Sequence, residues 1–143
     1  MSEYITREVD YAIRILAYLA GKQEKTKIAE ICKKLHLKRP FVVKIIHKLN
    51  KCGIIKTTTG KNGGILINKD ISKLSLYDIC LCLGFKTSIN ICVNKPEQCE
   101  LNPICNITTF FAGLQNSIVT KLKSAKIEQF IFNDEDLDKI NQT

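Results

Sequence analysis

Long apolar runs are missing from this sequence of 143 residues. No stretch approaches the ~20 consecutive apolar residues that a membrane-spanning helix needs. The first twenty residues are partly apolar, but Arg7, Glu8, Asp10 and Arg14 interrupt them long before the length of a signal-peptide core. We therefore expect a cytoplasmic chain that is neither exported nor bound to a membrane.

A recognisable set of catalytic groups is also lacking. The two histidines, His36 and His47, are expected to serve in packing or as phosphate contacts rather than as ligands. The sequence has no internal repeat, and a chain of this length with 45% apolar residues can form one domain with its own core plus an appendage. We therefore expect a protein that is not an enzyme and has no small-molecule substrate.

Positive charge is concentrated in the first half of the chain. Residues 1–69 carry 15 Lys or Arg against 5 Asp or Glu, a charge of +10, whereas the remainder carries 7 against 9, a charge of −2. Such a basic half is typical of a module that attracts a polyanion. The alternative is a solvated surface over which lysines are scattered, and composition alone leaves it open.

Apolar residues at helical spacing predict three helices in the basic half. The first covers residues 5–20, with Thr6 placed to cap it. The second covers residues 26–35, and the third covers residues 40–51. The third opens with Pro40, a residue that is well tolerated in the first turn of a helix.

Two short β-branched runs follow the third helix. They lie at residues 54–57 and 65–67 and are joined by Thr-Gly-Lys-Asn-Gly-Gly, a sequence suited to a hairpin turn. Ser75 and Asp78 have the spacing of a capping box and predict a fourth helix. Three helices followed by a hairpin form a winged helix-turn-helix, so we expect a mainly α fold with a small β-hairpin wing.

Periodicity is lost between residues 86 and 106, which predicts an irregular loop, and loops of this length are usually functional. From Ile107 to Ala125 apolar residues recur at alternating four- and three-residue spacing, the pattern of a helix packed on another helix, here from a second copy of the chain. The closing stretch is acidic and polar and is expected to be loosely ordered. We divide the chain into a winged-helix domain at 1–84, a cysteine-bearing loop at 85–106, a dimerisation helix at 107–132 and a polar tail at 133–143.

The expected function of the winged helix is to bind double-stranded DNA. The second helix of a helix-turn-helix enters the major groove, and that helix here is residues 40–51. Lys and Arg side chains can meet phosphate oxygens and guanine edges, and a wing tip reaches adjacent backbone. The expected DNA contacts are Thr26, Lys38, Arg39, Pro40, Lys44, His47, Lys48, Thr59, Lys61, Asn62 and Gly63. An adaptor that binds another protein is the alternative, because fold alone does not establish function.

Seven cysteines in a chain without an export signal are expected to stay reduced, which argues against structural disulfides. Cys92, Cys99 and Cys105 lie in the irregular loop, too far apart for a usual zinc knuckle and without a nearby histidine. Their spacing leaves an iron-sulfur cluster, zinc, free thiols and a redox disulfide open. A free cysteine in or beside a helix is most often a small buried apolar residue, and this is expected for Cys32, Cys52, Cys80 and Cys82.

Five segments, in this order along nearly the whole chain, resemble a known family. They are Asp10-Tyr-Ala-Ile-Arg14, Pro40-Phe-Val-Val-Lys-Ile-Ile, Gly60-Lys-Asn-Gly-Gly-Ile, Ser75-Leu-Tyr-Asp-Ile and the three spaced cysteines. Each segment is weak alone, but together they are specific. The chain resembles the Rrf2 family of winged-helix transcription regulators, which includes iron-sulfur sensors.

The resemblance implies a homodimer that binds a near-palindromic operator, and we expect it to act as a repressor. It implies that Cys92, Cys99 and Cys105 ligate an iron-sulfur cluster, close to the DNA-binding domain of the partner subunit. The cluster would control operator affinity in response to nitric oxide, iron or redox state. The alternative is a thiol- or zinc-dependent DNA-binding regulator without a cluster.

Two positions depart from the family pattern. Members with a two-iron cluster can use a histidine three residues after the third cysteine, and this chain has Thr108 there, so a [4Fe-4S] cluster is expected rather than a [2Fe-2S] cluster. The wing arginine of many relatives is Thr59 here, so operator preference is expected to differ.

The fourth ligand is expected to be Asp10, because an aspartate at that position in nitric-oxide-sensing members reaches the partner's cluster. Glu8 is the alternative ligand, and a solvated carboxylate is the alternative role for Asp10.

Overall fold

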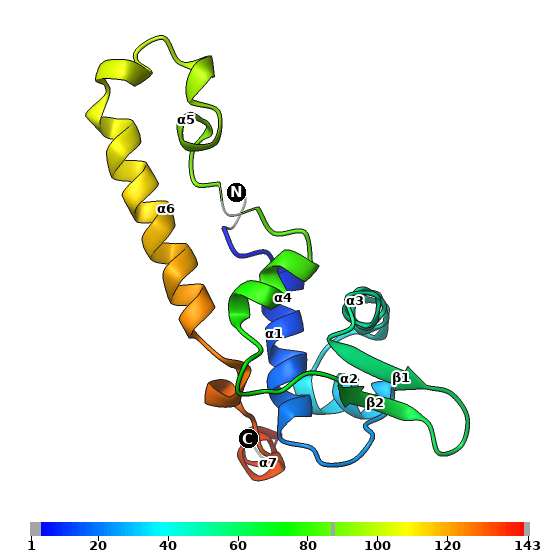
Figure 1. Ribbon diagram of the computed structural model, residues 1–143. Helices are drawn as coiled ribbons and strands as arrows, with labels where there is room; N and C mark the ends of the chain where they lie inside the picture. The colour runs from blue at the N-terminus through cyan, green and yellow to red at the C-terminus, as the bar shows by residue number, and fades with distance from the viewer. Residues whose placement is uncertain (1–3, 87, 142–143) are drawn as a thin grey trace.

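The computed structural model describes residues 4–86 and 88–141. Short helices and a two-stranded hairpin lie at one end, and α6 extends from them toward a cysteine-bearing segment at the other end (Figure 1). The predicted fold class, mainly α with a small β-hairpin wing, is confirmed. No helix in the described ranges is both long and apolar enough to cross a membrane. The helices and strands are α1 (Arg7–Ala20), α2 (Ile28–Leu35), α3 (Arg39–Lys51), β1 (Ile55–Thr58), β2 (Gly64–Ile67), α4 (Leu76–Cys82), α5 (Ile91–Asn94), α6 (Asn106–Ser124) and α7 (Asp134–Asn141), with 3-10 turns η1 (Pro96–Gln98), η2 (Asn102–Ile104) and η3 (Ile127–Phe130).

Helix α1 is the centre of the winged-helix domain. Thr6 caps it as predicted, because the Thr6 hydroxyl accepts a hydrogen bond of 3.3 Å from the Val9 N–H. The apolar face packs against α2, α3 and α4. Each large aliphatic side chain that is buried contributes about 1.5–3 kcal/mol, so this face holds the helix in place. The buried residues of α1 are Val9, Ala12, Ile15, Leu16, Ala17, Tyr18 and Leu19.

Helices α2 and α3 form the predicted helix-turn-helix. His36 ends α2 in the left-handed conformation, with φ of 55°, and turns the chain toward α3. Pro40 lies in the first turn of α3, where a missing N–H costs no intrahelical hydrogen bond. Gly53 follows α3 with φ of 76°, a conformation that glycine adopts at little cost, and leads into the hairpin. The inner face of α3 is buried through Val42, Ile45, Ile46 and Leu49.

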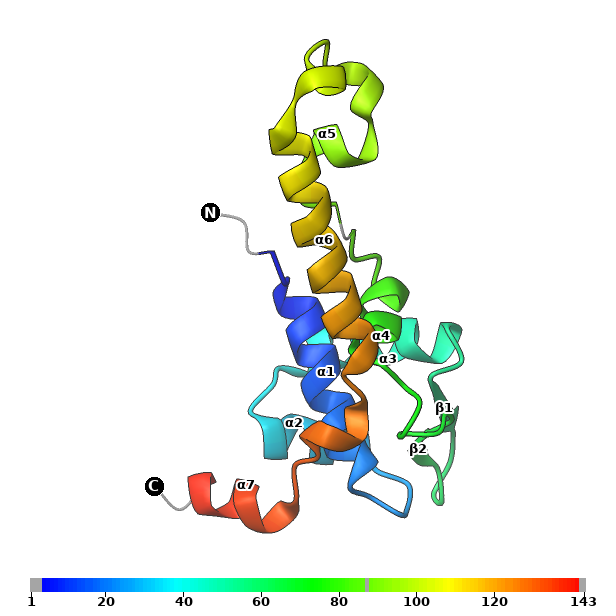
Figure 2. The same cartoon turned by 60° about the vertical axis from the view of Figure 1, so that its left-hand side comes forward.

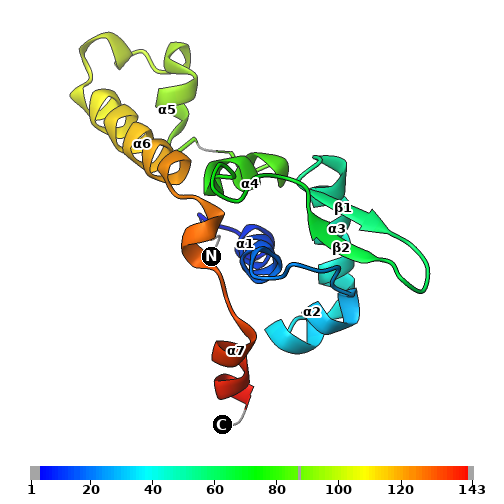
Figure 3. The ribbon, with the colours of Figure 1, turned by 60° about the horizontal axis from the view of Figure 1, so that its bottom comes forward.

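The hairpin pairs β1 and β2 in antiparallel register, with Ile55 opposite Ile67 and Thr58 opposite Gly64. The backbone of Thr26 adds an isolated bridge to Ile65, with N–H to oxygen distances of 3.1 and 2.9 Å. This bridge attaches the segment before α2 to the wing. The hairpin and α6 extend from α1 in different directions (Figure 3).

Helix α4 begins with the predicted capping box. The Asp78 N–H donates to Ser75 Oγ at 3.0 Å, and the Ser75 N–H donates to Asp78 Oδ2 at 3.1 Å. The reciprocal bonds satisfy two N–H groups at the start of the helix. The helix ends at Cys82, directly before the cysteine-bearing segment.

Helix α6 runs beside α4 (Figure 2). None of the side chains along α6 is buried within the single chain. Ile107 is 62% exposed, Phe110 is 66% exposed and Leu114 is 39% exposed. These three residues are spaced three and four apart and therefore share one face of the helix. An apolar stripe therefore faces away from the rest of the chain along the first half of α6.

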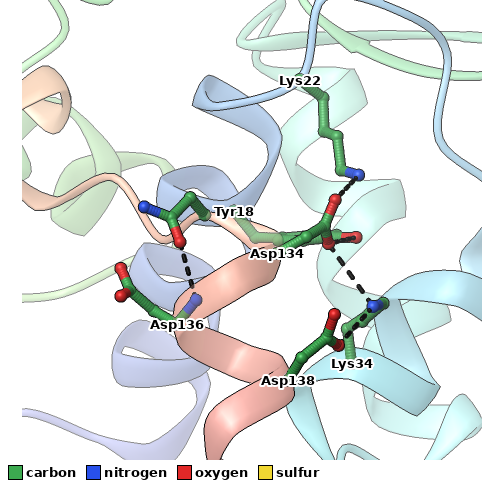
Figure 4. A network of polar contacts seen from close by, with 7 residues as sticks. Tyr18, Lys22, Lys34, Asp134, Asp136 and Asp138 are labelled. Carbon is green, nitrogen blue, oxygen red and sulfur yellow. Dashed lines mark hydrogen bonds and ion pairs between the residues drawn. The ribbon is translucent and has the colours of Figure 1, made fainter.

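The acidic C-terminal stretch forms helix α7, so the expectation of a loosely ordered segment was wrong. Asp134 accepts hydrogen bonds from the ammonium of Lys22 and from the hydroxyl of Tyr18, the latter at 3.2 Å (Figure 4). Lys34 lies 3.6 Å from Asp134, and Leu137 is buried. Partners on α1 and α2, far away in sequence, therefore order the segment.

The structure also corrects the expectation of reduced, buried thiols at two positions. Cys52 and Cys82 form a disulfide, with Cα atoms 6.0 Å apart. Cys52 is exposed, and Cys82 is half-buried and packed against the core. Cys80 is a buried free thiol as predicted, and Cys32 is a half-buried free thiol packed against the core.

Candidate functional site

The outer face of α3 is basic and exposed. Lys38, Arg39, Pro40, Lys44 and His47 are all exposed. The opposite face of the helix is buried in the core. Because burial of that apolar face fixes the rotation of the helix, the basic side chains are held together on the outside.

A concave surface lies between α2, α3 and the hairpin, with a cavity volume of about 680 Å³. Three predicted DNA contacts, Arg39, His47 and Thr59, line it. The surface thus combines the recognition helix and the wing. Sequence reasoning missed further lining residues, namely Lys27 directly before α2, Asn50 on α3 and Thr57 on β1.

The wing tip exposes Lys61 and Asn62, as predicted. Two lysines before α2 support it, which the sequence did not reveal. Lys27 Nζ donates to the Gly60 carbonyl at 3.2 Å, and Lys25 Nζ donates to the Asn62 carbonyl at 3.5 Å. The positive charge of the wing region is therefore greater than the hairpin sequence alone indicates.

Two of the predicted DNA contacts differ from the others because they are buried. The Thr26 side chain is 2% exposed, and its hydroxyl has no hydrogen-bond partner among the described residues. Its backbone pairing with Ile65 turns the side chain into the protein. Gly63 is also buried, and a Cβ there would lie 2.2 Å from the Thr58 carbonyl oxygen. Gly63 therefore belongs to the hairpin turn, where a side chain would not fit.

Glu8 in the first turn of α1 forms ion pairs with two recognition-helix lysines. Its carboxylate contacts the Lys48 ammonium and lies 3.6 Å from Lys44 Nζ. The Lys44 side chain remains 61% exposed. A carboxylate beside these lysines partly neutralises the charge that a phosphate would meet.

Asp10 lies two residues further along α1, on the surface. Its carboxylate accepts a hydrogen bond of 3.0 Å from Arg14 Nε, and its side chain is 44% exposed. In the described part of the chain, no three His, Cys, Asp or Glu side chains are grouped as a metal site. Asp10 is therefore not brought together with Cys99 and Cys105 of its own chain.

Cys105 occupies the N-cap position of α6. The backbone N–H groups of Thr108 and Ile107 lower the pKa of the Cys105 thiol, with a smaller contribution from the Thr108 hydroxyl. Thr108, which cannot replace a histidine ligand, thus favours the thiolate instead. Cys99 is a half-buried free thiol at the end of η1. The prediction for Cys92 concerns a side chain outside the described residues, although its backbone lies in α5.

Comparison with known proteins places this geometry in context. The sequence profile of the Rrf2 family, described as iron-dependent transcriptional regulators, matches residues 5–133. A protein of Aquifex aeolicus (strain VF5) named as an HTH-type transcriptional regulator is 31% identical over 127 residues, which cover 86% of this chain and 88% of that protein.

Solved structures share the fold. CymR (YrzC), the global cysteine regulator of B. subtilis, has a TM-score of 0.71 and 19% identity, covering 90% of this chain and 95% of that chain. T. potens IscR has a TM-score of 0.66 and 17% identity, covering 86% of this chain and 82% of that chain. At these identities the similarity shows a common fold. It does not show that this chain binds the ligands of those proteins.

Proposed function

Because this chain belongs to the Rrf2 family of DNA-binding transcription regulators, we propose that an iron-sulfur cluster on Cys92, Cys99 and Cys105 controls its affinity for an operator. Proteins of this family are transcriptional regulators and not enzymes. The observation that carries the proposal is the environment of Cys105, where the first turn of α6 lowers the pKa of the thiol. The thiolate is the form of cysteine that binds metal.

DNA binding is assigned to the outer face of α3 and the wing. The helix enters the major groove with Lys38, Arg39, Lys44 and Lys48 in or beside it. Burial of the opposite face fixes the rotation of α3 about its own axis. Lys61 and Asn62 at the wing tip contact the adjacent phosphate backbone. This surface is supported by its exposure and by the concave space between α3 and the hairpin.

The chemistry of the cysteine-bearing segment fits an iron-sulfur cluster. Its thiols are soft ligands, and Cys99 and Cys105 carry no disulfide. When bound, the cluster supplies a centre that responds to nitric oxide, iron supply or redox state. The chain contributes the thiolates, and α6 anchors them by its contact with α4.

In this proposal, dimerisation through α6 brings the cysteines of one subunit close to the DNA-binding domain of the other. A monomer would leave the exposed face with Ile107, Phe110 and Leu114 in water, which soluble chains avoid. Pairing of two α6 helices would bring the cysteines of one subunit toward α1 of its partner, where Asp10 would provide the fourth ligand of a [4Fe-4S] cluster. Residues 1–84 would then bind DNA, residues 85–106 hold the cluster and residues 107–132 form the dimer.

The first turn of α1 couples the two sites in this proposal. Asp10 lies near Glu8, and Glu8 is ion-paired with Lys44 and Lys48 on the recognition helix. A change at Asp10 would therefore shift α1 against α3 and alter the position of these lysines. Two distinct sites that bias one structural element meet the requirement for allostery.

Metal analysis of protein purified without oxygen tests the cluster. We expect iron and acid-labile sulfide in the native protein and their loss on Cys99→Ala or Cys105→Ala. Asp10→Ala should retain the dimer and bind a less stable cluster, because it removes only the hard oxygen ligand. Zinc in place of iron in the native protein would reject the cluster.

A thiol sensor without a cluster is the second candidate. The lowered pKa of Cys105 favours it too, since a thiolate is also the form that oxidants attack. Colourless, iron-free protein whose operator binding changes when Cys105 is oxidised would support this candidate.

A further inference from the structure

The Cys52–Cys82 disulfide joins the two functional elements of the winged helix. Cys52 caps the C-terminus of α3, the recognition helix, and Cys82 is the last residue of α4. Gly53 turns the chain from α3 toward β1, so the bridge fixes the junction of recognition helix and wing against α4. Neither cysteine belongs to the segment that carries Cys92, Cys99 and Cys105.

The bridge is open to small molecules on two sides. A cavity of about 590 Å³ is lined by both cysteines together with two lysines and two aspartates, Lys69, Lys73, Asp70 and Asp78. A second cavity, of about 310 Å³, is lined by both cysteines together with Lys48 and Lys51. Through these cavities a small disulfide can reach the two sulfurs, and the thiolate is the form of cysteine that reacts in thiol-disulfide exchange.

Each sulfur has a carbonyl oxygen beside it that can accept a hydrogen bond once the bridge is reduced. Cys82 Sγ lies 3.4 Å from the carbonyl oxygen of Lys48, and Cys52 Sγ lies 3.7 Å from the carbonyl oxygen of Cys82. After reduction each S–H can donate to the carbonyl that it already contacts. Both thiols can therefore form hydrogen bonds when the bridge is open.

We propose that Cys52 and Cys82 form a reversible redox site that exchanges with low-molecular-weight disulfides and adjusts operator affinity. The Cys52 thiolate, which is the more exposed, attacks one sulfur of the small disulfide and releases one small thiolate. The Cys82 thiolate then attacks Cys52 Sγ, forms the bridge and releases the second small thiolate. Two protein thiols are oxidised, one small disulfide is reduced, and the two protons pass to the released thiolates.

Oxidation ties the end of α3 to α4 and so pre-organises the recognition helix. Lys48 and Lys51 lie in the last turn of α3, beside the bridge. Reduction frees this turn, and the ordering that DNA binding then requires lowers affinity. The oxidised protein is thus the tighter DNA binder.

The first test uses the full chain with Cys92, Cys99 and Cys105 replaced by Ala, so that the result is independent of the cluster. The protein is equilibrated without oxygen in mixtures of reduced and oxidised glutathione, free thiols are alkylated, and the linked peptide is quantified by mass spectrometry. We expect Cys52 and Cys82 to convert together, in proportion to oxidised glutathione over the square of reduced glutathione. A bridge that is absent at every ratio, or that reduced glutathione does not open, overturns the proposal.

Two variants accompany the titration. Cys52→Ser should abolish the linked peptide and leave Cys82 as a thiol or as a mixed disulfide with glutathione. Cys32→Ser, which removes a free thiol outside the pair, should leave the transition unchanged. Loss of the transition in Cys32→Ser would assign the redox chemistry to other thiols and overturn the proposal.

The second test measures DNA affinity in the same cluster-free background. The probe is a duplex that the oxidised protein selects from a random library. Reduction should weaken binding at least about fivefold, and Cys52→Ser should bind equally in both buffers. Equal affinity of the oxidised and reduced forms overturns the regulatory role.

Discussion

At the scale of single residues, the position of a side chain relative to a helix end sets its chemistry. Cys105 caps α6, and the N–H groups that follow it hold the pKa of its thiol below the ordinary value. Cys80 lies inside the core, where burial raises the pKa of its thiol. Two thiols of one chain thus differ in reactivity because of their surroundings.

Alkylation rates should separate these two cysteines. At pH 7.5 without metal or oxidant, iodoacetamide should modify Cys105 at least about tenfold faster than Cys80, because only the thiolate reacts. Mass spectrometry of quenched samples gives both rates from one experiment. Equal rates for the two residues would contradict the lowered pKa of the Cys105 thiol.

Glu8 offers a second prediction at this scale. Glu8→Gln removes the carboxylate that Lys44 and Lys48 contact and should strengthen DNA binding about two- to fivefold, the size expected for exposed ion pairs. The measurement is fluorescence anisotropy with a labelled operator at several salt concentrations. Glu128→Gln, in η3, makes the same charge change away from α3. An equal gain in this control would attribute the effect to net charge instead.

At the scale of elements, the sequence predicted features that depend on neighbouring residues, such as helix caps. It did not predict contacts between residues that are far apart in the chain. Thr6, Pro40 and the Ser75 capping box act within one helical turn, so their roles were predicted correctly. Helix α7 was missed because its ordering depends on Lys22, which is 112 positions from Asp134. The same reason hid the disulfide, which joins residues 30 positions apart, and the burial of Thr26 against β2.

The α7 contacts predict a pH-dependent contribution to stability. The Lys22 ammonium lowers the pKa of Asp134 below its ordinary 3.8, so the contribution is present above that value and is lost as the pH falls through the lowered pKa. Asp134→Asn should reduce the free energy of unfolding at pH 7 by less than about 1 kcal/mol, because the pair is partly exposed.

Urea unfolding of wild type and Asp134→Asn at pH 7 and at pH 3 measures this contribution. The difference between the two proteins should shrink at the lower pH. Asp136→Asn is the matched control, since Asp136 lies on the side of α7 away from Lys22 and Lys34 (Figure 4). A difference that grows on acidification would contradict the proposed pairing.

At the scale of the whole molecule, α6 leaves large apolar side chains exposed in the single chain. Figure 1 shows the cysteine-bearing segment and the wing at opposite ends of the molecule, so the two lie far apart within one subunit. The sequence predicted the apolar spacing of α6 but not that Phe110 would be its most exposed aromatic residue. Which face of α6 remains exposed depends on how α4 packs against it, and spacing alone does not determine this.

Disrupting the α6 face tests the dimer. Leu114→Asp places a charge in the middle of the exposed stripe and should convert dimers to monomers, because burial of an unpaired carboxylate is costly. Light scattering on a size-exclusion column gives the mass, and Asn116→Asp on an exposed position of the same helix is the control. A Leu114→Asp protein that remains dimeric would place the interface elsewhere.

We propose that the three-cysteine segment controls DNA binding through an iron-sulfur cluster. The most direct test is the operator dissociation constant of one preparation made without oxygen, measured before and after removal of the iron by a chelator, with Cys99→Ala treated identically. The glutathione ratio is held constant, so that the Cys52–Cys82 pair does not change. We predict that wild type loses iron and sulfide together and changes its affinity at least about fivefold, whereas Cys99→Ala does not change. Identical wild-type affinities before and after the loss of iron would show that the cluster does not control DNA binding.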